Sequence, residues 1–217
     1  MPRRFPRPAI CVVTAGTARC ADDAAAHEIV TLARAAAAAG IDLVQVREPR
    51  LTAAELWKLV ERVVAAVVRT ETAVLVNDRI DVALATGADG VHLRGDAMPA
   101  SRVRSVGWEG FLIGRSVHSA AEAREAENDG GAEYLIFGTV FPSRGKPPGH
   151  PVAGVDGLRA VCGAVRLPVI AIGGIDTSRI GEAARAGAAG VAAIGMFADA
   201  ARKGEIELVV QQVRRAF

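Results

Sequence analysis

Aromatic side chains are scarce in this sequence of 217 residues: they make up 4% of it, although 51% of the residues are hydrophobic. Cysteine is also rare, and Cys11, Cys20 and Cys162 are too few and too far apart for a disulfide framework or a cysteine metal site. We therefore expect a reducing compartment, the cytoplasm. No apolar run reaches the roughly 18 residues that a membrane helix needs, so no membrane association is expected.

An excess of charge of one sign is lacking too, because 26 Lys and Arg residues stand against 24 Asp and Glu residues, a net charge of +2. This balance gives no reason to expect a nucleic-acid partner. Charged residues make up 23%, and the many apolar residues can bury a core, which excludes general disorder. We expect one domain over residues 1–217, with the Arg- and Pro-rich residues 1–8 as a disordered N-terminal arm.

Glycine, by contrast, is plentiful and recurs in one pattern. Four segments run from a helix-like stretch through a glycine (Gly40, Gly87, Gly131 and Gly187) into a short apolar run. Glycine ends helices because it takes the left-handed conformation easily, and the apolar run after it predicts a buried strand. Three further apolar runs lie between these segments and a fourth precedes the first, so we expect eight strands. The helices predicted to alternate with them span 23–39, 52–69, 79–86, 100–106, 119–129, 155–163, 177–186 and 199–215.

This alternation predicts an α/β fold, a single (β/α)8 TIM barrel. The predicted strands lack polar alternation, which is typical of parallel strands buried on both faces. An open doubly wound sheet is the structural alternative, but the four-fold pairing and the count of eight favour closure. In such a barrel the active site forms from the loops that follow the strands.

Two of these loops predict a phosphate site. Gly173 and Gly174 follow the seventh predicted strand, and Gly195 follows the eighth. Glycines there expose backbone N–H groups beside a helix N-terminus, an arrangement that binds phosphate dianions. The alternative is that the glycines only make tight turns.

Basic residues that follow other strands are predicted to meet at the same opening. Arg47, Arg115, Arg144 and Lys146 would hold a second anionic group there, since guanidinium forks match carboxylates and phosphates. Solvated surface charge is the alternative.

Carboxylates and histidines complete the set of candidates. Asp78 and Asp96 are candidate ligands for Mg²⁺, which takes one or two carboxylates besides phosphate oxygens. The alternative is that Asp78 caps the next helix. His118 lies just beyond the fifth strand and is a candidate proton carrier, with a structural role as the alternative. His92 lies within a strand and is predicted to be packed and hydrogen-bonded.

Six short motifs occur in order along the chain: Gln45-Val46-Arg47-Glu48, Asn77-Asp78-Arg79-Ile80-Asp81-Val82-Ala83, Gly87-Ala88-Asp89-Gly90-Val91-His92-Leu93, Ser116-Val117-His118-Ser119, Gly138-Thr139-Val140-Phe141-Pro142-Ser143 and Ile172-Gly173-Gly174-Ile175. Together they resemble the thiamine phosphate synthase superfamily, which includes the TenI group of thiazole tautomerases. The resemblance covers nearly the whole chain, from Ile10 to Phe197. It implies a (β/α)8 barrel and a homo-oligomer, a dimer or higher, in which Trp57 or Trp108 is either an interface anchor or a core residue.

Two activities are compatible with the resemblance. The synthase joins a pyrimidine pyrophosphate to a thiazole phosphate and uses Mg²⁺ to expel pyrophosphate. The tautomerase aromatises the carboxylate tautomer of the same thiazole phosphate by moving a proton, without a metal. The residues that match synthase positions for pyrimidine pyrophosphate or metal are Gln45, Arg47, Asn77, Asp78, Ser116 and Lys146.

Departures from the synthase pattern favour the tautomerase. Pro49 stands where the synthases have a lysine, Ala97 where they have a second metal aspartate, and Gly195 where they have a serine. The run from Pro142 to Lys146 keeps one of two usual hydroxyls, that of Ser143. Each lost charge-assisted contact removes about 1.5–3 kcal/mol.

We therefore predict an enzyme, a TenI-like thiazole tautomerase that needs no cofactor. In it His118 transfers the proton, and Arg47 with Lys146 orients the carboxylate. The residues predicted to contact the substrate are Gln45, Asn77, Ser116, Ser143, Gly173, Gly174 and Gly195. The alternative is a thiamine phosphate synthase with Mg²⁺ on Asp78 and Asp96, and a further alternative is a regulator that binds thiazole or thiamine phosphate without turnover.

Overall fold

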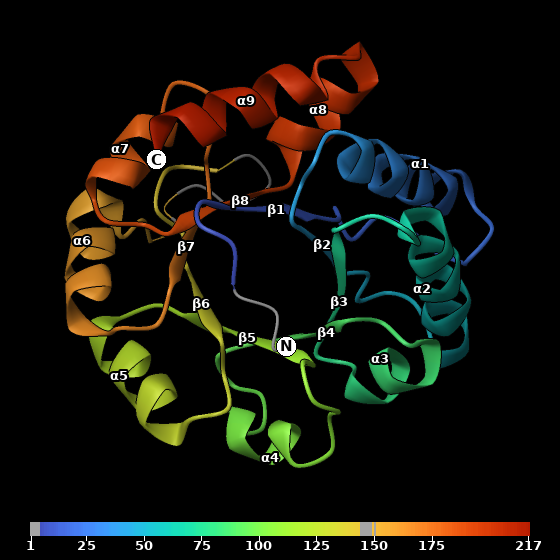
Figure 1. Ribbon diagram of the computed structural model, residues 1–217, viewed down its shortest axis with the longest axis horizontal. Helices are drawn as coiled ribbons and strands as arrows, with labels where there is room; N and C mark the ends of the chain where they lie inside the picture. Colours follow the sequence, from blue (N-terminus) through green and yellow to red (C-terminus); the bar gives the residue numbers. More distant parts are fainter. Residues whose placement is uncertain (1–4, 144–148, 150) are drawn as a thin grey trace.

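Eight parallel strands form a closed barrel (Figure 1), as predicted, and each pairs with its neighbours in chain order. The computed structural model describes residues 5–143, 149 and 151–217. β1 pairs with β8 through Ala9 opposite Gly190, which closes the barrel and excludes the open sheet. The strands are β1 (Ala9–Val13), β2 (Leu43–Val46), β3 (Ala73–Asn77), β4 (Gly90–Leu93), β5 (Leu112–Val117), β6 (Tyr134–Phe137), β7 (Val169–Ile172) and β8 (Gly190–Ala193).

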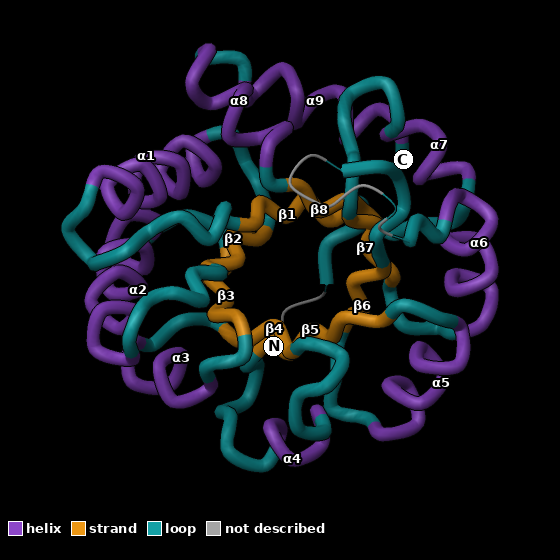
Figure 2. Tube along the Cα trace, turned by 180° about the vertical axis from the view of Figure 1, so that it is seen from behind, coloured by secondary structure: helices purple, strands orange, loops and turns teal. Residues whose placement is uncertain are grey.

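Helices surround the barrel and cover the outer face of the strands, which Figure 2 shows from the opposite side. Within the described residues they are α1 (Ala24–Ala38), α2 (Ala53–Val67), α3 (Ile80–Thr86), α4 (Ala100–Arg104), α5 (Ala120–Asp129), α6 (Gly154–Ala164), α7 (Ile180–Arg185), α8 (Gly195–Lys203) and α9 (Ile206–Ala216). None of them is long and apolar enough to cross a membrane.

The single helix predicted over 199–215 is wrong, since two helices occupy this region. α8 begins at Gly195, just after β8, and ends at Lys203, and its C-cap Gly204 has a left-handed φ of 71°. A residue in this conformation turns the chain out of a right-handed helix, and glycine adopts it without a side-chain clash. α9 then begins at Ile206.

Alternate residues of each strand face opposite sides, so the barrel has two apolar layers. The inner layer includes Cys11, Leu43 and Leu75, all of them buried. The outer layer packs the other strand residues against the helices, and α1 contributes small buried residues such as Ala26 and Ala33. Alanine lets a helix approach the sheet closely, which explains how an alanine-rich chain builds this fold.

The segment that leads into β1 crosses one opening of the barrel (Figure 1). Of the arm expected over residues 1–8, residues 1–4 lie outside the described part. The ring of Phe5 stacks on that of buried Tyr134, with the ring centroids 4.9 Å apart. Phe5 therefore closes the amino end of the barrel interior, and the carboxyl end is the one left for a site.

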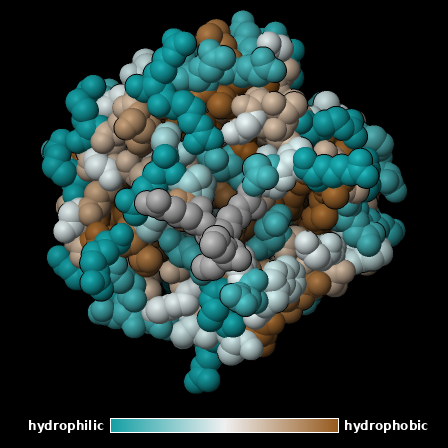
Figure 3. Space-filling view, viewed as in Figure 1, coloured by the Kyte–Doolittle hydropathy of each residue, from teal (hydrophilic) through white to brown (hydrophobic). Residues whose placement is uncertain are grey.

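Polar side chains cover much of the face that Figure 3 shows, with apolar residues in patches between them. The large exposed apolar residues of the described chain include Trp57 and Trp108, which are 38% and 44% exposed. Trp108 also packs edge-on against Phe111. Both tryptophans therefore lie at the surface, and neither is a buried core residue.

A substitution at Gly114 tests the packing inside the barrel. A Cβ atom there would lie 2.1 Å from Cζ of Tyr134 and 2.6 Å from Nδ1 of His92, both buried. We expect Gly114→Ala to lower the free energy of unfolding by about 1–3 kcal/mol, measured by urea titration, because overpacking displaces these rings. Gly163→Ala in α6 is the control, since nothing lies within 4 Å of its Cβ position. It should gain about 0.5–1 kcal/mol from helix propensity. Equal stability of the two variants would contradict the packing described here.

Candidate active site at the carboxyl ends of the strands

A row of hydrogen-bonded polar side chains crosses the carboxyl ends of β2 and β3. Nε2 of Gln45 donates to Oδ1 of Asn77 at 2.9 Å, and Nδ2 of Asn77 donates to Oδ2 of Asp78 at 2.9 Å. Gln45 is buried, and its Oε1 has no hydrogen-bond partner among the described residues. A buried acceptor without a partner is rare in folded proteins and suggests a place for a ligand. The structure thus brings three of the predicted site residues together.

Asp78 is held in an unusual backbone conformation. Its φ of 58° is left-handed, which Asp and Asn tolerate better than most residues. Its amide donates to the carbonyl of His92 at 2.9 Å, and its Oδ1 accepts the amide of Arg94 at 2.7 Å. The alternative in which Asp78 caps the next helix is wrong, because Arg79 is the N-cap of α3 and no side chain caps that helix. The carboxylate instead ties the end of β3 to the loop after β4.

Arg94 joins the two carboxylates that were predicted to hold a metal. Its Nε lies 2.8 Å from Oδ2 of Asp78 and 3.3 Å from Oδ1 of Asp96. In the described part of the chain, no three His, Cys, Asp or Glu side chains gather where a metal ion could be held. The structure therefore shows Asp78 and Asp96 near one another and both paired with a cation of the chain itself. The sequence analysis gave Arg94 no role. The only indication in the sequence was that Arg94 lies between Asp78 and Asp96, directly after a predicted strand.

Arg47 follows β2, and its surroundings are fixed by a buried carboxylate. The amide of Arg47 donates to Oγ1 of Thr14 at 2.9 Å, and the guanidinium is exposed with no ion-pair partner in the described chain. Buried Glu48 accepts the amides of Gly16 at 3.0 Å and Ala18 at 2.9 Å. Glu48 therefore fixes the loop after β1 beside Arg47. Sequence reasoning gave it no role, although a carboxylate directly after a buried strand was the available signal.

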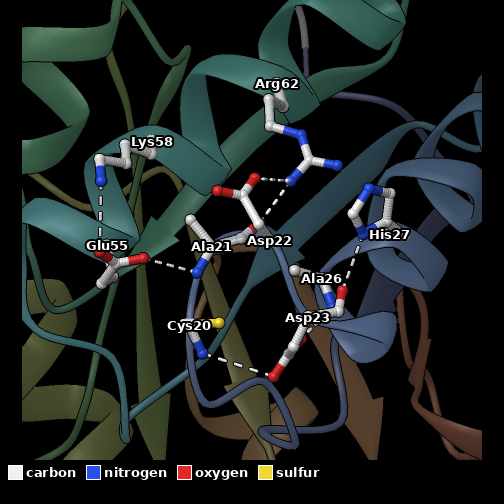
Figure 4. Close-up of polar contacts among 9 residues, drawn as sticks. All are labelled: Cys20, Ala21, Asp22, Asp23, Ala26, His27, Glu55, Lys58 and Arg62. Carbon is white, nitrogen blue, oxygen red and sulfur yellow. Dashed lines mark hydrogen bonds and ion pairs between the residues drawn. The ribbon is translucent and has the colours of Figure 1, made fainter.

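The same loop is attached to α2 from outside (Figure 4). Oε2 of Glu55 accepts the amide of Ala21 at 2.6 Å, and this hydrogen bond holds the pKa of Glu55 below its ordinary value. Arg62 donates to the carbonyl oxygen of Ala21 and lies 3.3 Å from Asp22. Contacts on both sides thus hold the loop after β1 in one position.

His92 and Ser116 form a second polar group, inside the barrel. Nε2 of His92 lies 2.8 Å from Oγ of Ser116, and Nδ1 lies 3.2 Å from the hydroxyl of Tyr134. Burial lowers the pKa of His92 from 6.5 to about 3, so its ring is neutral at pH 7. The prediction that His92 is packed and hydrogen-bonded is confirmed.

His118 is exposed, and its ring is oriented by a backbone carbonyl. Nδ1 lies 2.7 Å from the carbonyl oxygen of Gly138, which can only accept, so Nδ1 carries the hydrogen and neutral His118 keeps a lone pair on Nε2. The amide of His118 donates to Oε2 of Glu122 at 2.8 Å, and Ser119 caps α5 through the amide of Glu122 at 3.1 Å. The geometry is compatible with proton transfer at Nε2.

The four cations predicted to meet at one opening do not all do so. The guanidinium of Arg115 donates to the carbonyls of Gly95 and Met98, each at 2.8 Å, and of Ala97 at 3.2 Å. Arg115 alternates with inward-facing Ser116 on β5 and points outward, so its predicted place at the opening is wrong. Arg144 and Lys146 lie outside the described residues.

Two of the predicted phosphate-binding glycines have left-handed backbone conformations. Gly173 and Gly174 have φ of 98° and 62°, and a Cβ on Gly174 would lie 2.4 Å from the carbonyl oxygen of Pro142. Only glycine fits here. Ser143, which follows Pro142 in the chain, is half-buried. Gly195 begins α8, and no described acceptor takes the amide hydrogens of Gly195, Met196 and Phe197. Such free amides at a helix N-terminus suit a phosphate dianion. That these groups bind phosphate stays a prediction.

Comparison with known proteins gives consistent matches. The family model described as thiamine monophosphate synthase matches residues 11–197. A thiamine-phosphate synthase of Methanospirillum hungatei is 38% identical over 165 residues, 76% of this chain and 80% of that protein. A putative thiamine-phosphate synthase of Geobacter sulfurreducens is 41% identical over 172 residues, 79% of this chain and 80% of that protein. The solved structure of thiamine phosphate pyrophosphorylase from Pyrococcus furiosus superposes with a TM-score of 0.78 at 30% identity, covering 96% of both chains.

The low pKa of buried His92 predicts how stability depends on pH. The unfolded chain takes up a proton at His92 near pH 6.5, whereas the folded chain does so only near pH 3. The unfolded state therefore binds more protons between these values, and stability falls as the pH falls, by up to about 1.4 kcal/mol per pH unit. Between pH 7 and pH 5, the free energy of unfolding of His92→Gln should fall by about 2 kcal/mol less than that of His27→Gln. The second variant is the control, because His27 is exposed. Urea titrations would measure this, and parallel slopes would show that His92 is not the source.

Proposed function

Because this chain belongs to the thiamine monophosphate synthase and TenI family, we propose that it is a thiamine-phosphate synthase, which joins hydroxymethylpyrimidine pyrophosphate to thiazole phosphate. The names of its relatives support this activity, which the sequence motifs alone placed second. They give no support to the tautomerase that Pro49 and Ala97 favoured. The residues at these two positions account for the loss of one contact each. The likeness to one relative, in contrast, amounts to 41% identity over 172 residues.

The observation that carries the proposal is the row formed by Gln45, Asn77 and Asp78. The tautomerase has one substrate and needs a proton carrier at His118, so it would leave these three linked side chains without a role. The synthase has a second substrate, which they would bind. The unpartnered Oε1 of Gln45 would accept a hydrogen bond from an amino group, and the pyrimidine carries one. Its Nε2 is already held by Asn77, which fixes the direction of the amide.

Two separate anion sites fit two phosphorylated substrates. The free amides at the N-terminus of α8, with Gly173 and Gly174, would hold the thiazole phosphate. The exposed guanidinium of Arg47 would hold the pyrophosphate, assisted by Ser116 and by Lys146, which lies outside the described residues. A guanidinium offers paired donors that match phosphate oxygens.

In the proposed reaction the bond between the pyrimidine methylene carbon and a pyrophosphate oxygen breaks, and both electrons leave with pyrophosphate. The ring nitrogen of the thiazole then donates its electron pair to that carbon. Arg47 stabilises the negative charge that develops on the leaving group, which lowers the barrier because this interaction is strongest in the transition state. Gln45 and the glycine site hold the two rings in contact, so that the attack is effectively intramolecular.

Asp78 and Asp96 fit the ligand chemistry of Mg²⁺, which takes one or two carboxylates together with substrate phosphates. The ion would offset the charge of the leaving pyrophosphate. Arg94 is paired with both carboxylates, so binding of the ion requires that its side chain move away. Arg94 is 61% exposed and has room to do so.

One observation favours the tautomerase as a second candidate. The hydrogen bond from His118 to the carbonyl of Gly138 leaves Nε2 of His118 as a proton acceptor in an exposed position. This arrangement would serve the removal of a proton from a bound thiazole.

Incubation with hydroxymethylpyrimidine pyrophosphate, thiazole phosphate and Mg²⁺ tests the proposal. We expect thiamine phosphate and pyrophosphate in equal amounts, and no product after addition of a chelator. Asp78→Asn should lower kcat/KM by about 10- to 100-fold, because it removes a charge-assisted contact worth about 1.5–3 kcal/mol. Asp81→Asn is the matched control, since Asp81 pairs with Arg79 on the surface.

The other outcomes identify the alternatives. Aromatisation of the thiazole carboxylate tautomer, insensitive to chelator and lost in His118→Ala, without any thiamine phosphate, would establish the tautomerase. Binding of thiazole phosphate with neither reaction would establish a protein that binds without turnover.

Removal of Arg94 tests its competition with the metal. We expect Arg94→Ala to bind Mn²⁺ about two- to five-fold more tightly than the unaltered protein, because an exposed ion pair contributes up to about 1 kcal/mol. Electron paramagnetic resonance measures free Mn²⁺ without any turnover. Arg79→Ala, which breaks the comparable pair with Asp81, should leave the affinity unchanged. Weaker Mn²⁺ binding in Arg94→Ala would show that Arg94 orders the two carboxylates instead of competing for them.

A further inference from the structure

A column of aromatic and polar side chains runs through the barrel from its amino end to the candidate site. Phe5 stacks on Tyr134, the hydroxyl of Tyr134 contacts His92, and His92 contacts Ser116. Gly114 makes room for the two middle rings, since any side chain at this position would collide with both. Only Ser116, the last member, has a part in the proposed reaction. Tyr134 and His92, which are buried, have no part in that reaction as proposed.

The position of each hydrogen in this column follows from the hydrogen-bond partners. The hydroxyl of Tyr134 is buried, and Nδ1 of His92 is its only partner among the described residues. If Nδ1 carried a hydrogen, the hydrogen of the tyrosine hydroxyl would have no acceptor, and an unsatisfied buried donor costs about 1–3 kcal/mol. Tyr134 therefore donates to Nδ1. An imidazole ring that accepts a hydrogen bond at Nδ1 has no hydrogen on that atom, so its one hydrogen is on Nε2.

The hydrogen on Nε2 determines what Ser116 can do. Nε2 of His92 donates to Oγ of Ser116 at 2.8 Å, so the serine oxygen accepts a hydrogen bond from the barrel interior. The hydrogen of the serine hydroxyl is then free to point toward the opening of the barrel. With the opposite tautomer Ser116 would donate to His92 and present only lone pairs to the opening, which would repel a phosphate oxygen.

We propose that Tyr134 and His92 are positioning residues that fix Ser116 as a hydrogen-bond donor to an anionic oxygen of the substrate. This inference rests on the proposed function for the identity of the anion, which is the pyrophosphate of the pyrimidine substrate. Neither positioning residue touches the substrate. They orient the hydroxyl hydrogen of Ser116 toward the opening before the substrate binds, so that no buried group needs to reorient.

The tautomer of His92 can be observed directly by long-range ¹H–¹⁵N correlation in labelled protein at pH 7, with the signals assigned by their loss in His92→Gln. We expect the Nε2–H tautomer. Tyr134→Phe should abolish this preference, because the donor to Nδ1 is gone. Phe5→Leu is the control, since Phe5 stacks on Tyr134 without forming a hydrogen bond and should leave the tautomer unchanged. An Nδ1–H tautomer or a charged ring in the unaltered protein would overturn the proposal.

A double-mutant cycle separates positioning from general damage to the fold. We expect Tyr134→Phe to raise the KM of hydroxymethylpyrimidine pyrophosphate by about 2- to 10-fold, the effect of one hydrogen bond. The KM of thiazole phosphate should stay unchanged, because Ser116 does not contact that substrate. In a Ser116→Ala background the same tyrosine substitution should change neither KM, whereas damage to the barrel would persist there.

Binding measurements keep this test independent of turnover. If the protein forms no thiamine phosphate, calorimetric affinities for inorganic pyrophosphate and inorganic phosphate replace the KM values. The proposed function would then have failed, while the positioning role would still be decided. An equal loss of affinity from Tyr134→Phe in both backgrounds would overturn that role.

Discussion

Pairing of β1 with β8 is the constraint on which the rest of the molecule depends. At this seam Gly190 lies opposite Ala9, and a Cβ on Gly190 would lie 2.0 Å from the carbonyl oxygen of Ala9. Glycine therefore allows the last strand to reach the first. Once the barrel is closed, every strand residue faces either the enclosed interior or the surrounding helices, and the choice alternates along the chain.

This alternation selects the side chains of the candidate site. Gln45, Asn77, His92 and Ser116 occupy inner positions near the carboxyl ends, whereas Arg115, one residue from Ser116, faces outward and binds loop carbonyls. Carboxylates then hold the loops in place, since Glu48 accepts two backbone amides of the loop after β1 and Glu122 accepts one just after β5. The site is thus a rigid inner layer with fixed loops around it, which suits a reaction that depends on the placement of two substrates.

Much of this arrangement was predictable from the sequence. Glycines and short apolar runs predicted eight strands and a barrel, and the six motifs predicted the family that the comparisons confirm. The region after β8 was not predicted correctly, because the apolar pattern continues across Gly204 while the left-handed conformation there divides the helix. The departures at Pro49 and Ala97 favoured the tautomerase, whereas the relatives are named thiamine-phosphate synthases.

The sequence by itself determined the element order, the family and the residue types available at the carboxyl ends, because local periodicity and turn chemistry encode these features. Only the tertiary structure decided the partners of those residues. Arg94 pairs with Asp78, 16 positions away, and His92 contacts Tyr134, 42 positions away. Such contacts depend on strand register and on barrel closure, which set the direction and burial of each side chain. Burial in turn keeps His92 neutral, a property that its place in the sequence does not reveal.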